Sequence, residues 1–153
     1  MGMTRSSILP VRIRPAVATD AAEIARLATL LGYPASTEEI AERLKHLLAS
    51  ASYFIAVADT SSGLAGWVAA ERRVLLESGE RAELVGLIVE PDERRSGIGK
   101  TLVQAAEEWA VAQHLDVISV RSNVARAESH PFYESLGYTR RKTQHAYAKQ
   151  LRA

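Results

Sequence analysis

Hydrophobic residues recur along this chain with two periods, that of a strand and that of a helix. The alternation of apolar and polar positions over residues 11–17 predicts a first strand. Two helical stretches follow, and each begins with a pair typical of a capping box, Asp20 with Glu23 and then Ser36 with Glu39. The break between these two helices falls at Gly32-Tyr33-Pro34.

The second half of the chain repeats strand and helix patterns in an order that indicates an α/β fold. A long helix should run from Gly97 to about Gln113, with Ile98, Leu102, Ala105 and Trp109 on one apolar stripe. A short helix should end near Leu136. The stretches expected to form strands are residues 53–58, 64–76, 81–90 and 115–121, with a final hairpin over the tail, 138–151.

Composition narrows the class of protein. The 153 residues suit one domain, which we expect over 11–153, after a flexible N-terminus of residues 1–10. A net charge of +1 argues against a nucleic-acid surface, and the absence of cysteine excludes a thiolate nucleophile. Neither a signal peptide nor a membrane-spanning stretch is apparent, and the four scattered histidines suggest no metal site. We therefore expect a soluble, cytoplasmic protein.

The most informative segment lies between the strand that stops at Pro91 and the helix that begins near Gly97. A strand that turns into a helix exposes the first backbone amides of the helix, and these amides bind anions. Glycine at two of the turn positions lets a phosphate approach the main chain closely. The predicted diphosphate-binding residues are Arg94, Arg95, Ser96, Gly97, Ile98, Gly99, Lys100 and Thr101.

Three phosphate-binding patterns compete for this turn. A dinucleotide-binding fingerprint needs a third glycine at position 102, which is Leu, and a P-loop needs glycine at position 94, which is Arg. The pattern R-x-x-G-x-G, Arg94 through Gly99, resembles the acetyl-CoA pyrophosphate loop of the GCN5-related N-acetyltransferase (GNAT) family. A second stretch, His130 to Tyr138, resembles the late F/L-Y-x-x-x-G-F/Y motif of the same family.

This resemblance covers residues 11–151 and implies a fold, a cosubstrate and a reaction. The fold would be a mixed, mostly antiparallel sheet of about six to seven strands flanked by four helices, with a V-shaped splay between the central parallel strands. The reaction would move an acetyl group from acetyl-CoA to a small-molecule or protein amine by direct attack. The segment Leu87, Ile88 and Val89 would pair with the pantetheine arm, and the family also suggests a homodimer.

The resemblance also assigns roles to single residues. Tyr133 matches the family tyrosine that protonates the departing thiolate. Glu83 falls where some members carry a glutamate that acts as the base, whereas others use a chain of water molecules. On a strand, Glu83, Val85 and Leu87 share one face, so we expect that carboxylate to look into the cleft beside the acetyl group. Tyr33 and Trp67 are candidate walls of the acceptor cleft.

One position departs from the family pattern. The asparagine that often precedes the late tyrosine by seven residues is here Arg126, and Asn123 lies too early for us to count it as a cofactor ligand. His130 lies one turn before Tyr133 and is either a surface residue or a neighbour that tunes the site.

Two other functions remain open at this point. One is a non-catalytic acyl-CoA-binding or regulatory module of the same fold, which would bind the cosubstrate without turnover. The other is a nucleotide phosphotransfer domain, suggested by Gly99-Lys100-Thr101. Because an alkylammonium has a pKa of about 10.4, only about one amine in 2,500 is neutral at pH 7, so an active transferase needs a route for that proton.

Overall fold

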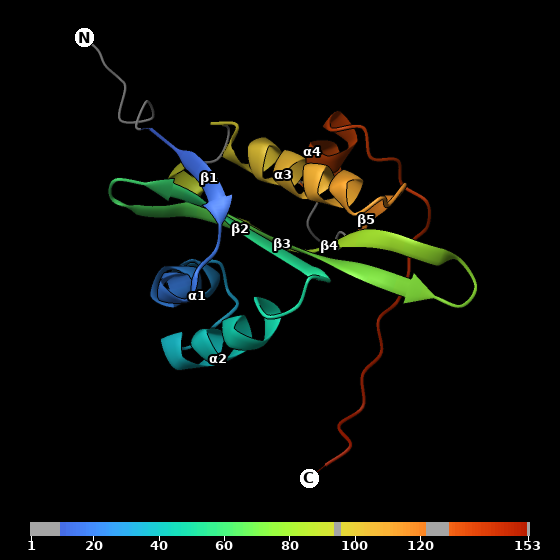
Figure 1. Cartoon of the computed structure of the whole chain (residues 1–153), viewed down its shortest axis with the longest axis horizontal. Coiled ribbons are helices and arrows are strands. Elements are labelled where there is room, and N and C mark those ends of the chain that lie inside the picture. Colours follow the sequence, from blue (N-terminus) through green and yellow to red (C-terminus); the bar gives the residue numbers. More distant parts are fainter. Residues whose placement is uncertain (1–9, 94–95, 122–128, 153) are drawn as a thin grey trace. The chain divides into compact units, whose positions relative to one another are not determined.

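The structure is a computed structural model that describes residues 10–93, 96–121 and 129–152 (Figure 1). The chain divides into two compact units, Met1–Val120 and Arg121–Ala153. The strands of the first unit are β1 (Arg12–Pro15), β2 (Tyr53–Thr60), β3 (Gly63–Leu75), β4 (Gly79–Val89) and β5 (Ile118–Val120). Its helices are α1 (Ala21–Leu30), α2 (Thr37–Leu47) and α3 (Ile98–Ala112), with short 3₁₀ helices at Ala18–Asp20 and Pro91–Glu93. The second unit contains α4 (Ser129–Ser135).

The five strands form one sheet in the order β1-β2-β3-β4-β5. The first three pairings are antiparallel, and β4 pairs with β5 in parallel. That parallel ladder joins only three residue pairs, from Ala82 with Ile118 to Leu84 with Val120. A parallel connection needs a crossover element, and α3 supplies it.

The prediction of six to seven strands was wrong. Among the described tail residues, 138–152, no strand or helix forms, and Tyr147 and Leu151 are exposed. An isolated hairpin is marginal in water unless a sheet or an apolar face supports it. The strand expected over 115–121 is also shorter than predicted. Its first residues close the end of α3, because Leu115 donates its N–H to the Ala110 carbonyl at 3.0 Å.

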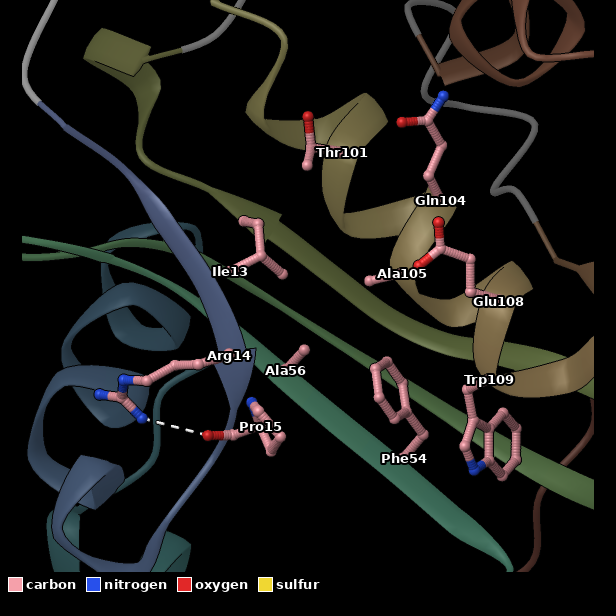
Figure 2. A pocket seen from close by; sticks show the side chains of 10 residues that line it. All are labelled: Ile13, Arg14, Pro15, Phe54, Ala56, Thr101, Gln104, Ala105, Glu108 and Trp109. Carbon is pink, nitrogen blue, oxygen red and sulfur yellow. Dashed lines mark hydrogen bonds between the residues drawn. The ribbon is translucent and has the colours of Figure 1, made fainter. Parts of the chain in front are cut away.

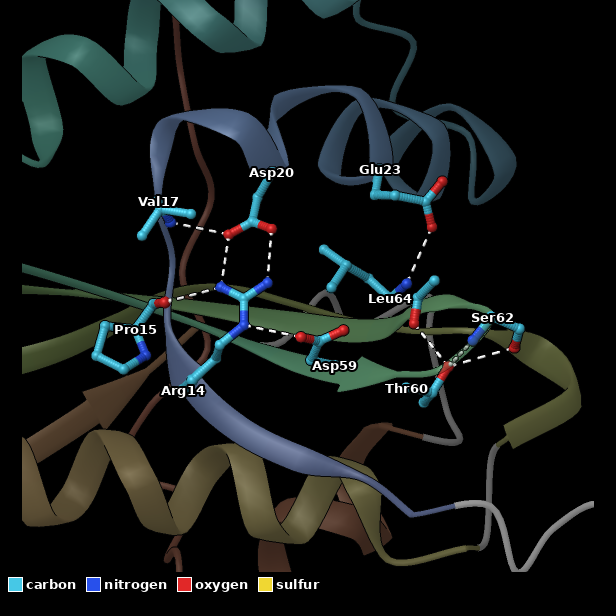
Figure 3. A network of polar contacts seen from close by, with 10 residues as sticks. Arg14, Pro15, Val17, Asp20, Glu23, Asp59, Thr60, Ser62 and Leu64 are labelled. Carbon is cyan, nitrogen blue, oxygen red and sulfur yellow. Dashed lines mark hydrogen bonds and ion pairs between the residues drawn. The ribbon is translucent and has the colours of Figure 1, made fainter.

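One predicted capping box is confirmed and the other is wrong. At the start of α2 the Glu39 N–H donates to Ser36 Oγ at 3.0 Å, and the Ser36 N–H donates to Glu39 Oε1 at 2.9 Å. Asp20, in contrast, makes no capping bond to α1. Its carboxylate accepts hydrogen bonds from Nη2 and Nη1 of Arg14, at 2.8 and 2.9 Å (Figure 3). These bonds connect β1 to the start of α1.

The ion pair of Arg14 with Asp20 is partly buried and has two further partners. Asp20 also accepts the Val17 N–H at 2.8 Å, and Arg14 Nε donates to Asp59 at 2.9 Å (Figure 3). The hydrogen bond from Arg14 holds the pKa of Asp20 below its ordinary value of 3.8. This network fixes the edge strand β1, because it joins that strand to both α1 and β2.

Helices cover both faces of the sheet. One face packs against α1 and α2 through a buried apolar cluster, and the other packs against α3, as Figure 1 shows. On the α3 face, a Cβ added to Gly66 of β3 would lie 3.2 Å from Leu102 of α3, so this helix lies close against the strand. The main members of the cluster on the α1/α2 face are Ile24, Leu27, Leu44, Ile55, Val57, Leu64 and Ile88.

Candidate functional site

Helix α3 begins at Ile98, directly after Gly97, so its first backbone amides have no partner within the helix. Gly97 is the N-cap residue with φ +88°, and the first helical bond runs from the Thr101 N–H to the Gly97 carbonyl at 3.0 Å. The N–H groups of residues 98–100 therefore have no partner within the helix. A Cβ added to Gly97 would meet no atom of the described residues within 4 Å, so on their side this turn is open to an approaching group.

The side chains around this turn divide into anchors and exposed groups. Ile98 is buried and anchors the first turn of α3, while the Thr101 hydroxyl donates back to the Gly97 carbonyl at 2.9 Å. Ser96 and Lys100 are exposed, and Gly99 is half-buried. Arg94 and Arg95, the basic residues of the predicted motif, lie outside the described residues.

Strand β4 continues towards this turn with only one paired edge. Leu87, Ile88 and Val89 pair with Val68, Trp67 and Gly66 of β3. The described ladder to β5 ends at Leu84, so the other edge of the segment lacks a strand partner within the described residues. That edge has the property required for backbone pairing with an extended ligand arm.

A β-bulge changes which residues of β4 share a face. Ala70 pairs with Leu84 and Ala69 pairs with Gly86, so Val85 is the extra residue. The expectation that Glu83, Val85 and Leu87 share one face was therefore wrong, because the inserted residue reverses the alternation.

The pairings of β4 with β3 show which β4 residues share a face with Glu83. Glu83, Gly86 and Ile88 lie opposite Glu71, Ala69 and Trp67, and these β3 residues alternate on one face. Since Ile88 and Trp67 pack with the α1/α2 cluster, Glu83 lies on that side of the sheet.

Glu83 is buried and forms an ion pair with Arg73. Only 8% of the residue is exposed, and its Oε1 accepts a hydrogen bond from Arg73 Nη1 at 3.1 Å. The Ser119 hydroxyl of β5 lies 3.4 Å from the same oxygen, and Arg73 also lies 3.5 Å from Glu71. The carboxylate is thus fixed within the described ladder of β4 and β5, where Glu83 pairs with Ser119.

The two proposed wall residues differ in their surroundings. Trp67 packs against the α1/α2 cluster and covers Gly86, where an added Cβ would lie 2.8 Å from Trp67 Cζ3. Its indole Nε1 is buried and has no hydrogen-bond partner among the residues that the structure describes. Tyr33 is half exposed in the loop between α1 and α2, and its N–H closes α1 on the Ala28 carbonyl at 2.8 Å.

In the second unit, Tyr133 occupies a fixed position near the end of α4. The helix ends in a Schellman motif, because the Tyr138 N–H donates to the Tyr133 carbonyl and the Gly137 N–H donates to the Glu134 carbonyl, both at 3.1 Å. Gly137 has φ +93°, as its place after the helix requires. The ring of Tyr133 packs edge-to-face on Tyr138 at 5.8 Å and on Phe132 at 5.0 Å.

The late motif of the sequence is therefore also a helix stop that orients its tyrosine. Burial raises the pKa of the Tyr133 phenol above its ordinary value of 10.0. His130 lies in the first turn of α4, and Asn123 lies outside the described residues.

A groove of about 480 Å³ lies on the opposite face of the sheet, between α3 and strands β1 and β2 (Figure 2). Its floor includes Phe54 and Trp109, whose rings stack at 5.7 Å, and Thr101 of the α3 turn lies at one end. Neither Glu83 nor Trp67 lines it, so this groove is separate from the charged residues described above.

The described part of the chain holds neither a metal-binding cluster nor a membrane-spanning helix. No group of three histidine, aspartate or glutamate side chains there is placed to hold a metal ion. Among those same residues, no helix combines the length and the apolar character that crossing a bilayer requires.

The sequence interpretation missed two features of this region. The bulge at Val85 was detectable in principle, since Gly86 within a strand pattern signals a bulge or a close approach. The second feature is the contact of Arg26, in α1, with Glu90, which follows β4. No local sequence pattern predicts this contact, because the two residues are far apart in the chain.

Comparison with known proteins gives a consistent result. A model of the acetyltransferase (GNAT) family matches residues 18–138. The uncharacterized N-acetyltransferase YhdJ of Bacillus subtilis is 27% identical over 103 residues, which are 67% of this chain and 72% of that protein.

Solved structures share the fold at low sequence identity. An aminoglycoside 6'-N-acetyltransferase from Acinetobacter baumannii superimposes with a TM-score of 0.81 at 22% identity, over 93% of this chain and 99% of that one. A second aminoglycoside N-acetyltransferase, in complex with CoA, gives a TM-score of 0.84 at 18% identity, over 93% of this chain and 96% of that one. The likeness extends over nearly the whole chain.

Proposed function

Because the chain belongs to the GNAT family of acetyltransferases, we propose that it is an acetyl-CoA-dependent N-acetyltransferase acting on a primary amine. The observation that carries this proposal is the start of α3, in the connection that follows β4, where Gly97 precedes backbone amides that have no partner within the helix. Helix N-termini of this kind bind phosphate groups through their N–H groups and dipole. A structural neighbour of the same fold binds CoA.

The residues of the turn fit the diphosphate of CoA. The amides of residues 98–100 would donate to its oxygens, and the exposed Lys100 would add a positive charge. Arg94, Arg95, Ser96 and Thr101 complete the proposed binding residues. Leu87, Ile88 and Val89 would pair with the pantetheine arm along the free edge of β4, in a V-shaped opening that begins where the β5 ladder ends.

CoA supplies an activated acetyl thioester, and the chain's own residues must manage the protons. An amine attacks only as the neutral base, and at pH 7 the protonated form costs about 4.6 kcal/mol to deprotonate. Glu83 is the proposed acceptor of that proton, directly or through water. It lies on the α1/α2 face one residue before the end of the described β4–β5 ladder, and Arg73 and Ser119 hold it in place.

Tyr133 is the proposed donor to the departing thiolate. A donor must be protonated at working pH, and burial, which raises the pKa of this phenol, keeps it in that form. The Schellman motif fixes the backbone of Tyr133, and the two neighbouring rings limit its rotation. Such proton transfers contribute typically about 10²–10⁴-fold to the rate.

The acceptor is proposed to be a small-molecule amine. Trp67 lies on the same face as Glu83, and Tyr33 is exposed in the α1–α2 loop, so the two are the proposed walls of the acceptor site. The structural neighbours named above are aminoglycoside acetyltransferases, which act on amino groups of small molecules. A protein amine and a homodimer remain further proposals of the family resemblance.

Two measurements test the function. Isothermal titration calorimetry with CoA should show one site per chain, and a thiol-release screen of small amines with acetyl-CoA should find a substrate. CoA binding without thiol release from any amine would favour a non-catalytic acyl-CoA-binding module. If CoA does not bind, the acetyltransferase assignment fails.

A further inference from the structure

An arginine of helix α1 joins three parts of the first unit that meet near the cofactor turn. Arg26 donates through Nε and Nη2 to the two carboxylate oxygens of Glu23, at 2.9 and 3.0 Å. Nη2 also donates to the Leu64 carbonyl at 3.1 Å, and Nη1 donates to Glu90 Oε2 at 3.1 Å. The planar guanidinium thereby holds α1, the start of β3 and the residue after β4 in one geometry.

Glu23 strengthens this junction from the other side. Its Oε1 accepts the Leu64 N–H at 2.9 Å (Figure 3), and a Cβ added to Gly63 would lie 2.5 Å from the same oxygen. The hydrogen bond from Arg26 lowers the pKa of Glu23. The Glu23 carboxylate and the Leu64 carbonyl therefore hold the Arg26 guanidinium in place, and its Nη1 donates to Glu90.

Glu90 leads directly into the turn that precedes α3. Its N–H is bonded to the Ala65 carbonyl at 2.8 Å, and its own carbonyl accepts the Glu93 N–H at 2.8 Å. The Glu93 carbonyl then accepts the Ser96 N–H at 3.3 Å, and the Ser96 hydroxyl donates to it as well. Gly97, the N-cap of α3, follows at once.

From this chain of contacts we infer that Arg26 is a positioning residue for diphosphate binding, acting through Glu90 on the turn that presents the α3 amides. The inference rests on the proposed function, because it takes CoA as the ligand of this turn. When a turn is already held in its binding geometry, less free energy is lost on ordering it as the ligand binds. The apparent affinity for the ligand rises with the fraction of molecules whose turn has this geometry.

The size of the effect follows from the exposure of the pair. The side chain of Arg26 is 43% exposed and that of Glu90 is 23% exposed. An ion pair in such a setting changes an equilibrium by about twofold to fivefold. We therefore expect Arg26→Met and Glu90→Gln each to raise the Kd for CoA by about twofold to fivefold.

The test compares ligands with and without the diphosphate. Calorimetry measures CoA, and an NMR titration measures pantetheine, which has the same thiol arm without the diphosphate. Both variants should lose affinity for CoA and keep their affinity for pantetheine. The double variant should bind CoA no more weakly than the weaker single variant, because both changes break one interaction.

Two controls separate positioning from general damage. Arg43→Met removes an exposed arginine from the neighbouring helix α2 and should leave both affinities unchanged. Glu90→Gln changes none of the groups that Arg26 binds at Glu23 and Leu64, so its effect on CoA affinity reports the Arg26–Glu90 contact alone.

Three results would overturn the inference while leaving the proposed function in place. These are an unchanged CoA affinity in Glu90→Gln, an equal loss of pantetheine affinity, and additive effects in the double variant. If the unaltered chain does not bind CoA, both the inference and the proposed function fail.

Discussion

Gly97 offers a way to separate backbone strain from ligand exclusion. Its φ of +88° lies in the left-handed region, where an L-residue with a Cβ is strained by roughly 1–2 kcal/mol. Replacement by alanine also lowers the conformational entropy of the unfolded chain, which offsets about 0.4–1 kcal/mol of this strain in the free energy of unfolding. Gly97→Ala should therefore destabilise the fold by roughly 0.5–1.5 kcal/mol, because an added Cβ meets no atom within 4 Å.

Gly79 provides the matched control. Its φ is +79°, and a Cβ there also meets no atom within 4 Å, but this glycine opens β4 at the far end of the strand from the cofactor turn. Gly79→Ala should cost the same stability. For a protein of 153 residues, both variants should melt about 1–6 °C lower than the unaltered chain.

Only the change at Gly97 should weaken CoA binding. A methyl group at the mouth of the turn would obstruct the amides of residues 98–100, and a hydrogen bond to a charged group is worth about 1.5–3 kcal/mol. The Kd of CoA should then rise roughly 10- to 100-fold in Gly97→Ala and remain unchanged in Gly79→Ala. Calorimetry well below both melting temperatures measures this. Equal affinities in the two variants would refute the assignment of the turn.

Three more substitutions test other parts of the structure. Tyr133→Phe should lower kcat by about 10²-fold or more without changing the Kd of CoA. The raised pKa of the phenol should keep the unaltered enzyme active up to about pH 10. An unchanged kcat in Tyr133→Phe, with chemistry shown to be rate-limiting, would remove Tyr133 from the mechanism. Gly86→Ala should destabilise the fold by roughly 1–3 kcal/mol, because its Cβ would lie 2.8 Å from Trp67. Urea denaturation should show a smaller cost in the Trp67→Phe background, and an equal cost there would exclude the contact as the cause. Asp20→Asn should cost roughly 2 kcal/mol at pH 7, because it breaks the partly buried pair with Arg14. Since the folded pKa of Asp20 is depressed, its contribution is present above about pH 4 and lost as the pH falls further; a difference between the two chains that stays constant down to pH 3 would contradict this.

The glycine turn before α3 was readable from the sequence because its signals are local. Gly97 follows a strand that stops at Pro91, and an apolar helix pattern begins one residue later. Helix N-caps, helix stops and left-handed glycines depend on a few neighbouring residues. For the same reason, the Ser36–Glu39 capping box and the helix stop at Gly137 were predicted correctly.

The faces of β4 could not be read in this way. Val85 has the composition of an ordinary strand residue, and only its register against β3 shows that it is inserted. That single insertion moved Glu83 to the face of Gly86 and Ile88 and away from that of Leu87. Periodicity assigns faces only where the ladder is regular.

Asp20 shows the same limit for polar side chains. Its sequence neighbours suggested a cap for α1, but Arg14 and Val17 bind the carboxylate instead. The choice depended on where the edge strand β1 lies against the helix, and local propensity contains no information on that position.

The sequence by itself determined the order of helices and strands, the glycine turn before α3 and the family, because each depends on residues close together in the chain. The tertiary structure decided the number of strands, the face that Glu83 occupies and the junction of Arg26 with Glu90. Those features are set by pairing and hydrogen bonding between distant segments, whose register and contacts exist only once the sheet has formed.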